Sequence, residues 1–222
     1  MNFYINHRFS VLLKNNWINK RYVPICAWQL RLLLILIGAN LAIATQSSMS
    51  NQVLLTQALR LGDLYNWSDS AQPFSVAEQL FTKAGDRRNA LYARLGRLRA
   101  TMEQYSLPAL SEQIMTLLDR EPLLQSDPPL RLFALMVKGD VDGELDPEPA
   151  RQDWEAVLTL ARQLGNQKWM DRASAEIGFA DFLEGNYDTA QKRVFGALAN
   201  VQAHHDIGAQ MRYLGPLVQG LF

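Results

Sequence analysis

Four segments of this chain repeat one apolar pattern, and this repetition restricts the possible folds more than any other feature. In each segment an apolar residue is followed four positions later by a large apolar residue, and three positions after that by a third one. The segments start at Ala77, Leu110, Ala150 and Ala190, so they are 33, 40 and 40 residues apart. Self-similarity at such a period is typical of helical repeat arrays, in which each unit buries its apolar face against its neighbours.

Apolar residues recur at helical spacing beyond residue 50, and the pattern predicts helices and no sheet. The predicted helices cover residues 50–65, 74–84, 87–104, 106–120, 128–138, 147–164, 167–184, 187–203 and 206–221. Gly85, Gly165 and Gly185 are each followed by Asp or Asn. In such a pair the glycine ends one helix in a left-handed conformation and the next side chain caps the following helix. Connections this short make neighbouring helices antiparallel.

The first 44 residues have the features of a targeting segment. They hold five basic residues and no acidic one, and a mostly apolar run of 13 residues, Leu32 to Ala44, ends in the small-x-small pattern Ala42-Ile43-Ala44. At about 1.5 Å per residue the run spans about 20 Å, less than a hydrocarbon core of about 30 Å. The pattern favours a signal peptide, with an uncleaved N-terminal membrane anchor as the alternative. Either way, the remaining chain is expected to be exported to the periplasm or the extracellular space.

Charge and cysteine content exclude several classes of partner and site. After a polar linker at residues 45–52, the domain at 53–222 has 17 basic and 22 acidic groups. Phosphate binding needs a basic surface, so we expect no nucleic acid partner, and membrane contact only through the N-terminal segment. The single cysteine, Cys26, lies in the targeting segment, so the domain has no disulfide and no thiolate metal site.

No residue group in the sequence stands out as a catalytic or metal centre. The acidic run from Asp140 to Asp146 alternates carboxylates, but its glycine is fourth rather than sixth and Pro147 and Pro149 follow, unlike a calcium loop. His204 and His205 are adjacent near a helix end, where a histidine complements the helix dipole. Asp181 and Glu184 share a helical face that suits solvent. We therefore expect no enzyme activity, no cofactor and no metal.

The stretch from Asp171 to Asn200 resembles a tetratricopeptide repeat (TPR). Ile177-Gly178 stands where that family has its small residue at the helix crossing, and Gly185-Asn186-Tyr187 looks like its inter-helix turn. The positions that match the second helix are Ala190, Val194 and Ala197, and further matches are Ala77, Phe81, Ala84 and Leu95-Gly96. The resemblance runs from about Phe74 to the end. It implies an all-α fold, a right-handed superhelical stack of antiparallel helical hairpins (a TPR-like α-solenoid); an irregular helical bundle is the alternative.

In the TPR family the first helices of the repeats line a concave groove that receives a peptide. The resemblance therefore implies partner-binding positions at Arg97, Arg172, Phe179, Phe182 and Arg212. Arginine and aromatic residues are enriched at binding hot spots, although core packing is the alternative for the two phenylalanines. No protein or peptide partner is identified by these residues.

The end of the chain looks like the first helix of a further repeat whose second helix is absent, so the domain looks truncated. Its apolar positions favour docking or self-association: Leu214, Leu217, Val218, Leu221 and Phe222. Together, these observations predict a non-catalytic scaffold that binds a protein or peptide outside the cytoplasm. The alternative is the sensing or regulatory region of a larger enzyme or signalling protein.

Overall fold

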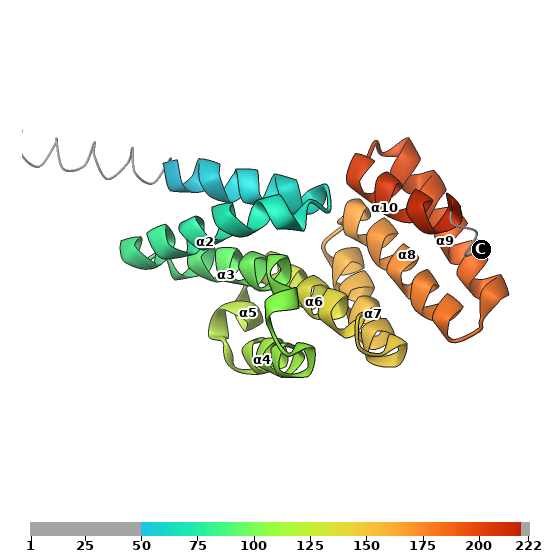
Figure 1. Ribbon diagram of the computed structural model, residues 1–222, viewed down its shortest axis with the longest axis horizontal. Coiled ribbons are helices and arrows are strands. Elements are labelled where there is room, and N and C mark those ends of the chain that lie inside the picture. The colour runs from blue at the N-terminus through green and yellow to red at the C-terminus, as the bar shows by residue number, and fades with distance from the viewer. Residues whose placement is uncertain (1–49, 219–222) are drawn as a thin grey trace, which may run out of the picture. The chain divides into compact units, whose positions relative to one another are not determined.

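The chain divides into two units, Met1–Gln46 and Ser47–Phe222, and the computed structural model describes residues 50–218, all within the second. The predicted targeting segment, with Cys26, and the last two apolar residues, Leu221 and Phe222, lie outside the described residues. Figure 1 shows the described residues as helices joined by short turns. Residues 50–218 contain no strand, which confirms the all-α class for this part of the chain.

A helical stretch over residues 50–63 begins the described part, three residues before the predicted end of the linker. The helices that follow it are α2 (Trp67–Ala84), α3 (Arg87–Ala100), the 3₁₀ turn η1 (Met102–Gln104), α4 (Leu107–Arg120), α5 (Pro122–Ser126), α6 (Pro128–Asp142), α7 (Pro147–Gln163), α8 (Gln167–Leu183), α9 (Tyr187–Ala203) and α10 (Ile207–Val218). From α6 onward each helix starts within a residue of its predicted first residue. The short helix α5 was not predicted.

Two predicted helix boundaries were wrong. Helix α2 begins at Trp67, seven residues before the predicted start, because the Asn66 side chain accepts a hydrogen bond from the Asp69 N–H (3.4 Å) and caps the helix. Its Ser-Asp-Ser segment therefore starts a helix and does not interrupt one. Helix α3 ends at Ala100, short of the predicted 104, and the Thr101 hydroxyl donates to the Arg97 carbonyl (2.8 Å) at that end.

The predicted helix stops at Gly85, Gly165 and Gly185 are confirmed, since their φ angles are 73°, 62° and 83°. Two non-glycine residues, Tyr65 and His205, occupy the equivalent position in their turns, each with a φ of 56°. All five positions are separated by 20 residues or a multiple of 20. The helices therefore have closely similar lengths, as stacked hairpins require.

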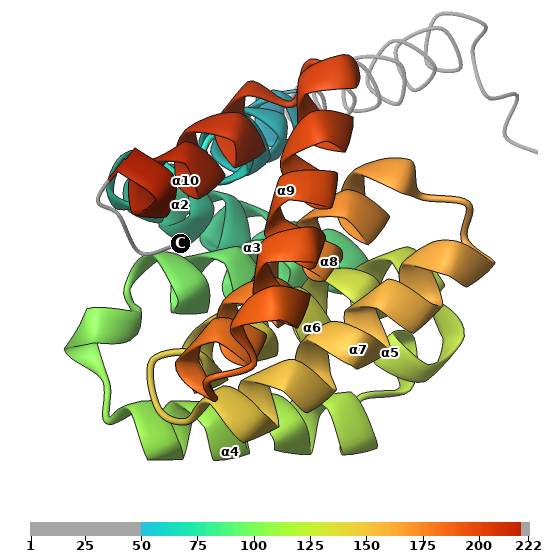
Figure 2. The same ribbon diagram turned by 90° about the vertical axis from the view of Figure 1, so that its right-hand side faces the viewer.

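Helices that are consecutive in the chain pack side by side. The largest contacts join α2 with α3, α6 with α7, α7 with α8 and α8 with α9 (Figures 1 and 2). Glycine permits the close approach at two crossings: a Cβ on Gly96 would lie 2.3 Å from the Phe74 ring, and one on Gly178 would lie 2.8 Å from Val194 Cγ2. This packing is compatible with a helical repeat array, while the right-handed TPR superhelix stays a prediction.

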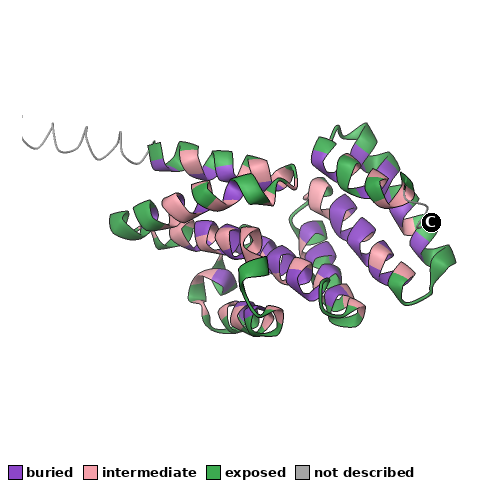
Figure 3. Ribbon diagram, viewed as in Figure 1, coloured by how far each residue is buried: buried purple, intermediate pink, exposed green. Residues whose placement is uncertain are grey.

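Helix α6 is the most enclosed element, with ten of its 15 residues buried (Figure 3). It belongs to the larger of two apolar clusters, whose buried members extend from Leu55 to Ile177. The smaller cluster joins α8, α9 and α10 around Tyr213. No helix in the described part of the chain has the length and apolarity needed to cross a bilayer.

The apolar face of α10 is only partly uncovered. Leu214 and Leu217, which were expected to be exposed, pack against the smaller cluster. Ile207, Met211 and Val218 remain 57%, 69% and 84% exposed. These three positions fall on one side of the helix, since residues four and seven apart share a face.

Candidate functional site

The turn at residues 62–66, before α2, contacts helices that lie far along the chain. Arg172 Nη2 in α8 donates to the Asp63 carbonyl oxygen (2.9 Å), and Lys168 Nζ lies 2.7 Å from Asp63 Oδ1. At the start of α10, a Cβ on Gly208 would lie 2.0 Å from the same carbonyl oxygen. Only glycine leaves room for this contact. The turn is thus joined to both α8 and α10, and Figure 1 shows its end of the ribbon beside α8.

Tyr65 is held by this turn in the left-handed conformation, which costs a non-glycine residue about 1–2 kcal/mol. Its N–H donates to the Gly62 carbonyl, and the next N–H donates to the Leu61 carbonyl, both at 2.9 Å. Guanidinium groups lie over its ring, Arg172 at 5.1 Å and Arg212 at 5.9 Å from the ring centre. Burial raises the pKa of Tyr65 well above its usual value, so the phenol stays neutral at physiological pH. Ring contacts with two cations offset the backbone strain.

Arg172 is the central charge of the site and is only 2% exposed. Its Nε and Nη2 donate to the two carboxylate oxygens of Asp206 at 2.8 and 2.7 Å, a bidentate pair. Its guanidinium also lies 5.3 Å from the centre of the Trp169 ring. Burial alone would raise the pKa of Asp206, but the hydrogen bonds and charge of Arg172 outweigh it and lower that pKa. The pair is therefore ionised on both sides.

Arg212 of α10 forms a second buried pair with α8. Its Nε and Nη2 each lie 3.3 Å from an oxygen of Glu176, whose residue is 7% exposed. Burial raises the pKa of Glu176 even though the Arg212 charge opposes that change. The Arg212 guanidinium is 5.9 Å from the Phe179 ring centre, and Phe179 lies against Tyr213 with ring centres 5.8 Å apart. This pair fixes α10 against α8.

Three of the five predicted groove residues come together in this region: Arg172, Phe179 and Arg212. The other two lie elsewhere. Arg97 pairs with Glu78 of α2 (2.6 Å) and donates to the Tyr105 hydroxyl (3.0 Å), and Phe182 packs edge-on against Tyr187 at 5.2 Å. The prediction missed Tyr65, which lies between the two arginines. Its place 20 residues before the Gly85-Asp86 stop was the available signal.

Two adjoining cavities lie beside these residues. The larger, here called the aromatic cavity, has a volume of about 270 Å³ and is lined by Leu59, Gly62, Asp63, Tyr65, Trp67, Phe74, Tyr92, Phe133, Met136, Asp140, Trp154, Asn166, Lys168, Trp169 and Arg172. The smaller, the charged cavity, has a volume of about 140 Å³ and is lined by Arg99, Gly139, Asp140, Gly143, Glu144, Pro147, Ala150, Trp154, Glu176, Phe179, Ala180, Leu183 and Arg212. Asp140 and Trp154 line both, so the two cavities are neighbours.

The carboxylates of the acidic run that begins at Asp140 are paired within the protein. Asp140 bonds to Arg99 Nε, Lys138 Nζ bonds to Asp142 Oδ2 (2.6 Å), and Asp146 accepts from the Glu148 N–H (3.0 Å) to cap α7. Among residues 50–218 no three His, Cys, Asp or Glu side chains are grouped as metal ligands are. This run therefore joins helices in the structure.

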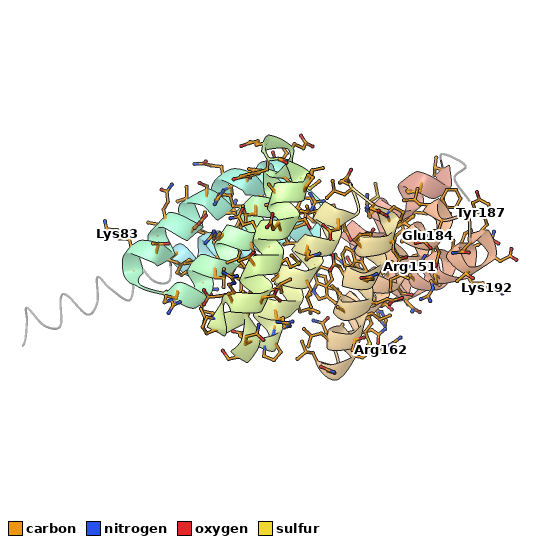
Figure 4. The ribbon with its side chains drawn as sticks, turned by 90° about the horizontal axis from the view of Figure 1, so that it is seen from below. Lys83, Arg151, Arg162, Glu184, Tyr187 and Lys192 are labelled. Atoms are coloured by element: carbon orange, nitrogen blue, oxygen red, sulfur yellow. The ribbon has the colours of Figure 1, made fainter. Side chains whose placement is uncertain are left out.

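His204 and Asp181, both expected at the solvent side of their helices, connect helices. His204 Nδ1 lies 3.1 Å from Asp171 Oδ2 of α8. Asp181 is only 3% exposed and pairs with Arg151 of α7, which also bonds Glu184 (Figure 4). The expectation that Asp181 faces solvent was wrong, because its helix is covered on both sides by α7 and α9.

The Arg172→Met variant tests how far this network holds the fold. It leaves the Asp206 carboxylate and the Asp63 carbonyl without their donor, so we expect the free energy of unfolding to fall by about 3–5 kcal/mol. Arg97→Met removes an arginine of a pair whose side chains are 25% and 23% exposed, and should cost about 1 kcal/mol or less. Urea unfolding of the full chain, followed by circular dichroism, gives both values. Equal losses in the two variants would contradict the prediction.

A second prediction concerns the two carboxylates that share Lys138. Burial, and then proton sharing with Asp142, outweigh the Lys138 charge and raise the pKa of Asp153 to about 6. The folded chain then holds this proton more tightly than the unfolded chain, so the Asp153 contribution to stability is greatest at low pH and is lost as pH rises from about 4 to about 6. Carbon NMR of the aspartate carboxyls should show one titration near pH 6.

Urea unfolding between these pH values provides the matched test. Asp153→Asn should remove the fall in stability, while Asp119→Asn, an exposed site in α4, should keep it. The pKa of Asp142 is held below its usual value by Lys138 against the effect of burial, so its own contribution is lost only below about pH 4. An Asp153 carboxyl that titrates near pH 4 would contradict the assignment.

Comparison with known proteins gives no further guide to the site. No protein-family model and no curated protein sequence matches this chain. The resemblance to TPR repeats therefore depends on the residues quoted in the sequence analysis.

Proposed function

We propose that this protein is a non-catalytic scaffold that binds a protein or peptide through the aromatic and charged cavities. One observation carries the proposal. Arg172 lines the aromatic cavity, and Phe179 and Arg212 line the charged cavity beside it. These are three of the positions that the TPR resemblance assigns to a peptide groove. Their gathering at two adjoining cavities supports a binding role for this region.

The chemistry of the two cavities also supports a peptide ligand. The aromatic cavity offers apolar and aromatic surface, which suits a side-chain anchor. The charged cavity offers guanidinium groups from Arg99 and Arg212 and carboxylates from Asp140 and Glu144. Such groups suit the amides and polar side chains of a peptide backbone. Leu183, at its edge, is 66% exposed and gives the ligand a further apolar contact.

The proposed site of action is outside the cytoplasm. Support comes from the first 44 residues, whose basic and apolar segments are typical of an export signal or anchor. Alkaline phosphatase, which folds only in oxidising compartments, should be active when fused after residue 222. The same fusion should be inactive when residues 1–44 are deleted. Activity without those residues would contradict export through them.

Peptide binding is tested with the full 222-residue chain against a displayed library of random peptides. Selected peptides should bind with a Kd of about 1 mM or tighter, measured by fluorescence polarisation. Leu183→Asp places a charge on the exposed edge of the charged cavity and should weaken binding by about tenfold. Leu80→Asp, at an exposed leucine of α2 that is 36% exposed, is the matched control and should bind normally.

Two results would overturn the proposal. One is a library that yields no peptide above background. The other is binding that Leu80→Asp weakens while Leu183→Asp leaves it intact, because the ligand would then lie on a different surface.

A further inference from the structure

Four aromatic rings of the aromatic cavity remain partly exposed, and each has an arginine of this chain over it. Arg99 lies 4.9 Å from the Trp67 ring centre and Arg88 lies 5.6 Å from that of Tyr92. The other two rings are those of Tyr65 and Trp169, to which Arg172 lies at 5.1 and 5.3 Å. All four ring residues are of intermediate burial. Exposed rings that converge on one hollow offer a ligand their faces and edges.

The arginines are held in place by their own carboxylates. Arg99 bonds Asp140, Arg88 bonds Asp127, and Arg172 makes its bidentate pair with Asp206. Each guanidinium therefore stays over its ring. Clustered aromatic rings usually favour a cationic ligand, but here the cation of each ring is already supplied by the protein. A second cation in the cavity would meet four positive groups across the rings.

The remaining attraction is for an uncharged aromatic group. Rings attract one another in offset or edge-to-face arrangements, and a ring whose far face carries a cation attracts an electron-rich partner. The buried part of the wall is apolar as well, since Phe74, Phe133 and Met136 are 0%, 8% and 3% exposed. The polar groups at Asp63 and Lys168 pair with each other. The cavity thus presents little that would compensate a ligand charge.

The size of the cavity limits the ligand further. A closed apolar cavity of about 150 Å³ accommodates benzene. The 270 Å³ of the aromatic cavity therefore exceeds the need of one six-membered ring and suits a fused two-ring system.

We infer that the aromatic cavity is a binding site for a planar, uncharged aromatic group about the size of an indole ring. The inference rests on the proposed function, in which this group is an aromatic side chain of the bound peptide. It names the side chain that anchors the peptide, and it makes the aromatic cavity the source of sequence preference. The charged cavity then holds the neighbouring backbone.

The site is tested with free 5-fluoroindole, whose binding to the full chain is followed by fluorine NMR. We expect saturable line broadening, no displacement by excess tetramethylammonium, and much weaker binding of the non-planar cyclohexanol. Leu59→Trp fills the cavity from the first helical stretch and should weaken fluoroindole binding by about tenfold or more. Leu80→Trp, the same change on an exposed part of α2, should leave it unchanged.

A second variant guards against misfolding of Leu59→Trp. Leu59→Ala enlarges the same cavity, so it should retain fluoroindole and gain affinity for the larger carbazole. Thermal melts followed by circular dichroism show whether each variant is folded. Displacement by tetramethylammonium, or fluoroindole binding that folded Leu59→Trp leaves unchanged, would overturn the inference.

The peptide assay separates this inference from the proposed function. Selected peptides should contain an aromatic residue whose replacement by alanine weakens binding by about tenfold. Peptides that bind without an aromatic residue and are insensitive to Leu59→Trp would overturn the inference and leave the proposed function standing. Fluoroindole binding in a chain that binds no peptide would support the aromatic site and overturn the proposed function.

Discussion

The buried charge of Arg172 is the interaction on which the arrangement of this helical unit depends. A guanidinium that is 2% exposed is stable only if every donor has a partner, because an unpaired buried charge costs several kcal/mol. Its partners come from Asp206, before α10, and from the Asp63 carbonyl in the turn before α2. One side chain of α8 thus fixes segments from both ends of the described residues. The Tyr65 ring beneath it is placed by the same contacts.

Helix α8 has further buried charges, and each connects it to another helix. Asp171 pairs with His204 of α9, Glu176 with Arg212 of α10, and Asp181 with Arg151 of α7. Small residues make up much of the remaining buried surface of α8, as at Gly178 and Ala180. Apolar contacts between small residues tolerate sliding, whereas directional ion pairs select one register. The register of four neighbouring helices is therefore set mainly by polar contacts.

Local chemistry explains how much of this could be predicted. Helices from α6 onward follow from Asp-Pro and Gly-Asn pairs, because caps and left-handed stops act within a few residues. The start of α2 was missed because Asn66 follows Tyr65, a residue that seldom adopts a positive φ, and so the stop was not recognised. The TPR resemblance brought Arg172, Phe179 and Arg212 to one region. It could not show their carboxylate partners, since pairs such as Arg172 and Asp206 depend on how distant segments meet.

The contact between Gly208 and the Asp63 carbonyl has a consequence for how the chain reaches its folded state. Synthesis proceeds from the N-terminus, and early segments fold while later ones are still being made. The turn at residues 62–66 emerges before α8 and α10, so its carbonyl must stay hydrated until Arg172, 109 residues later, is available. Non-local closure of this kind slows folding relative to a purely local stack of hairpins. On the ribosome, the first hairpin therefore waits unsealed, and closure is the last event of assembly.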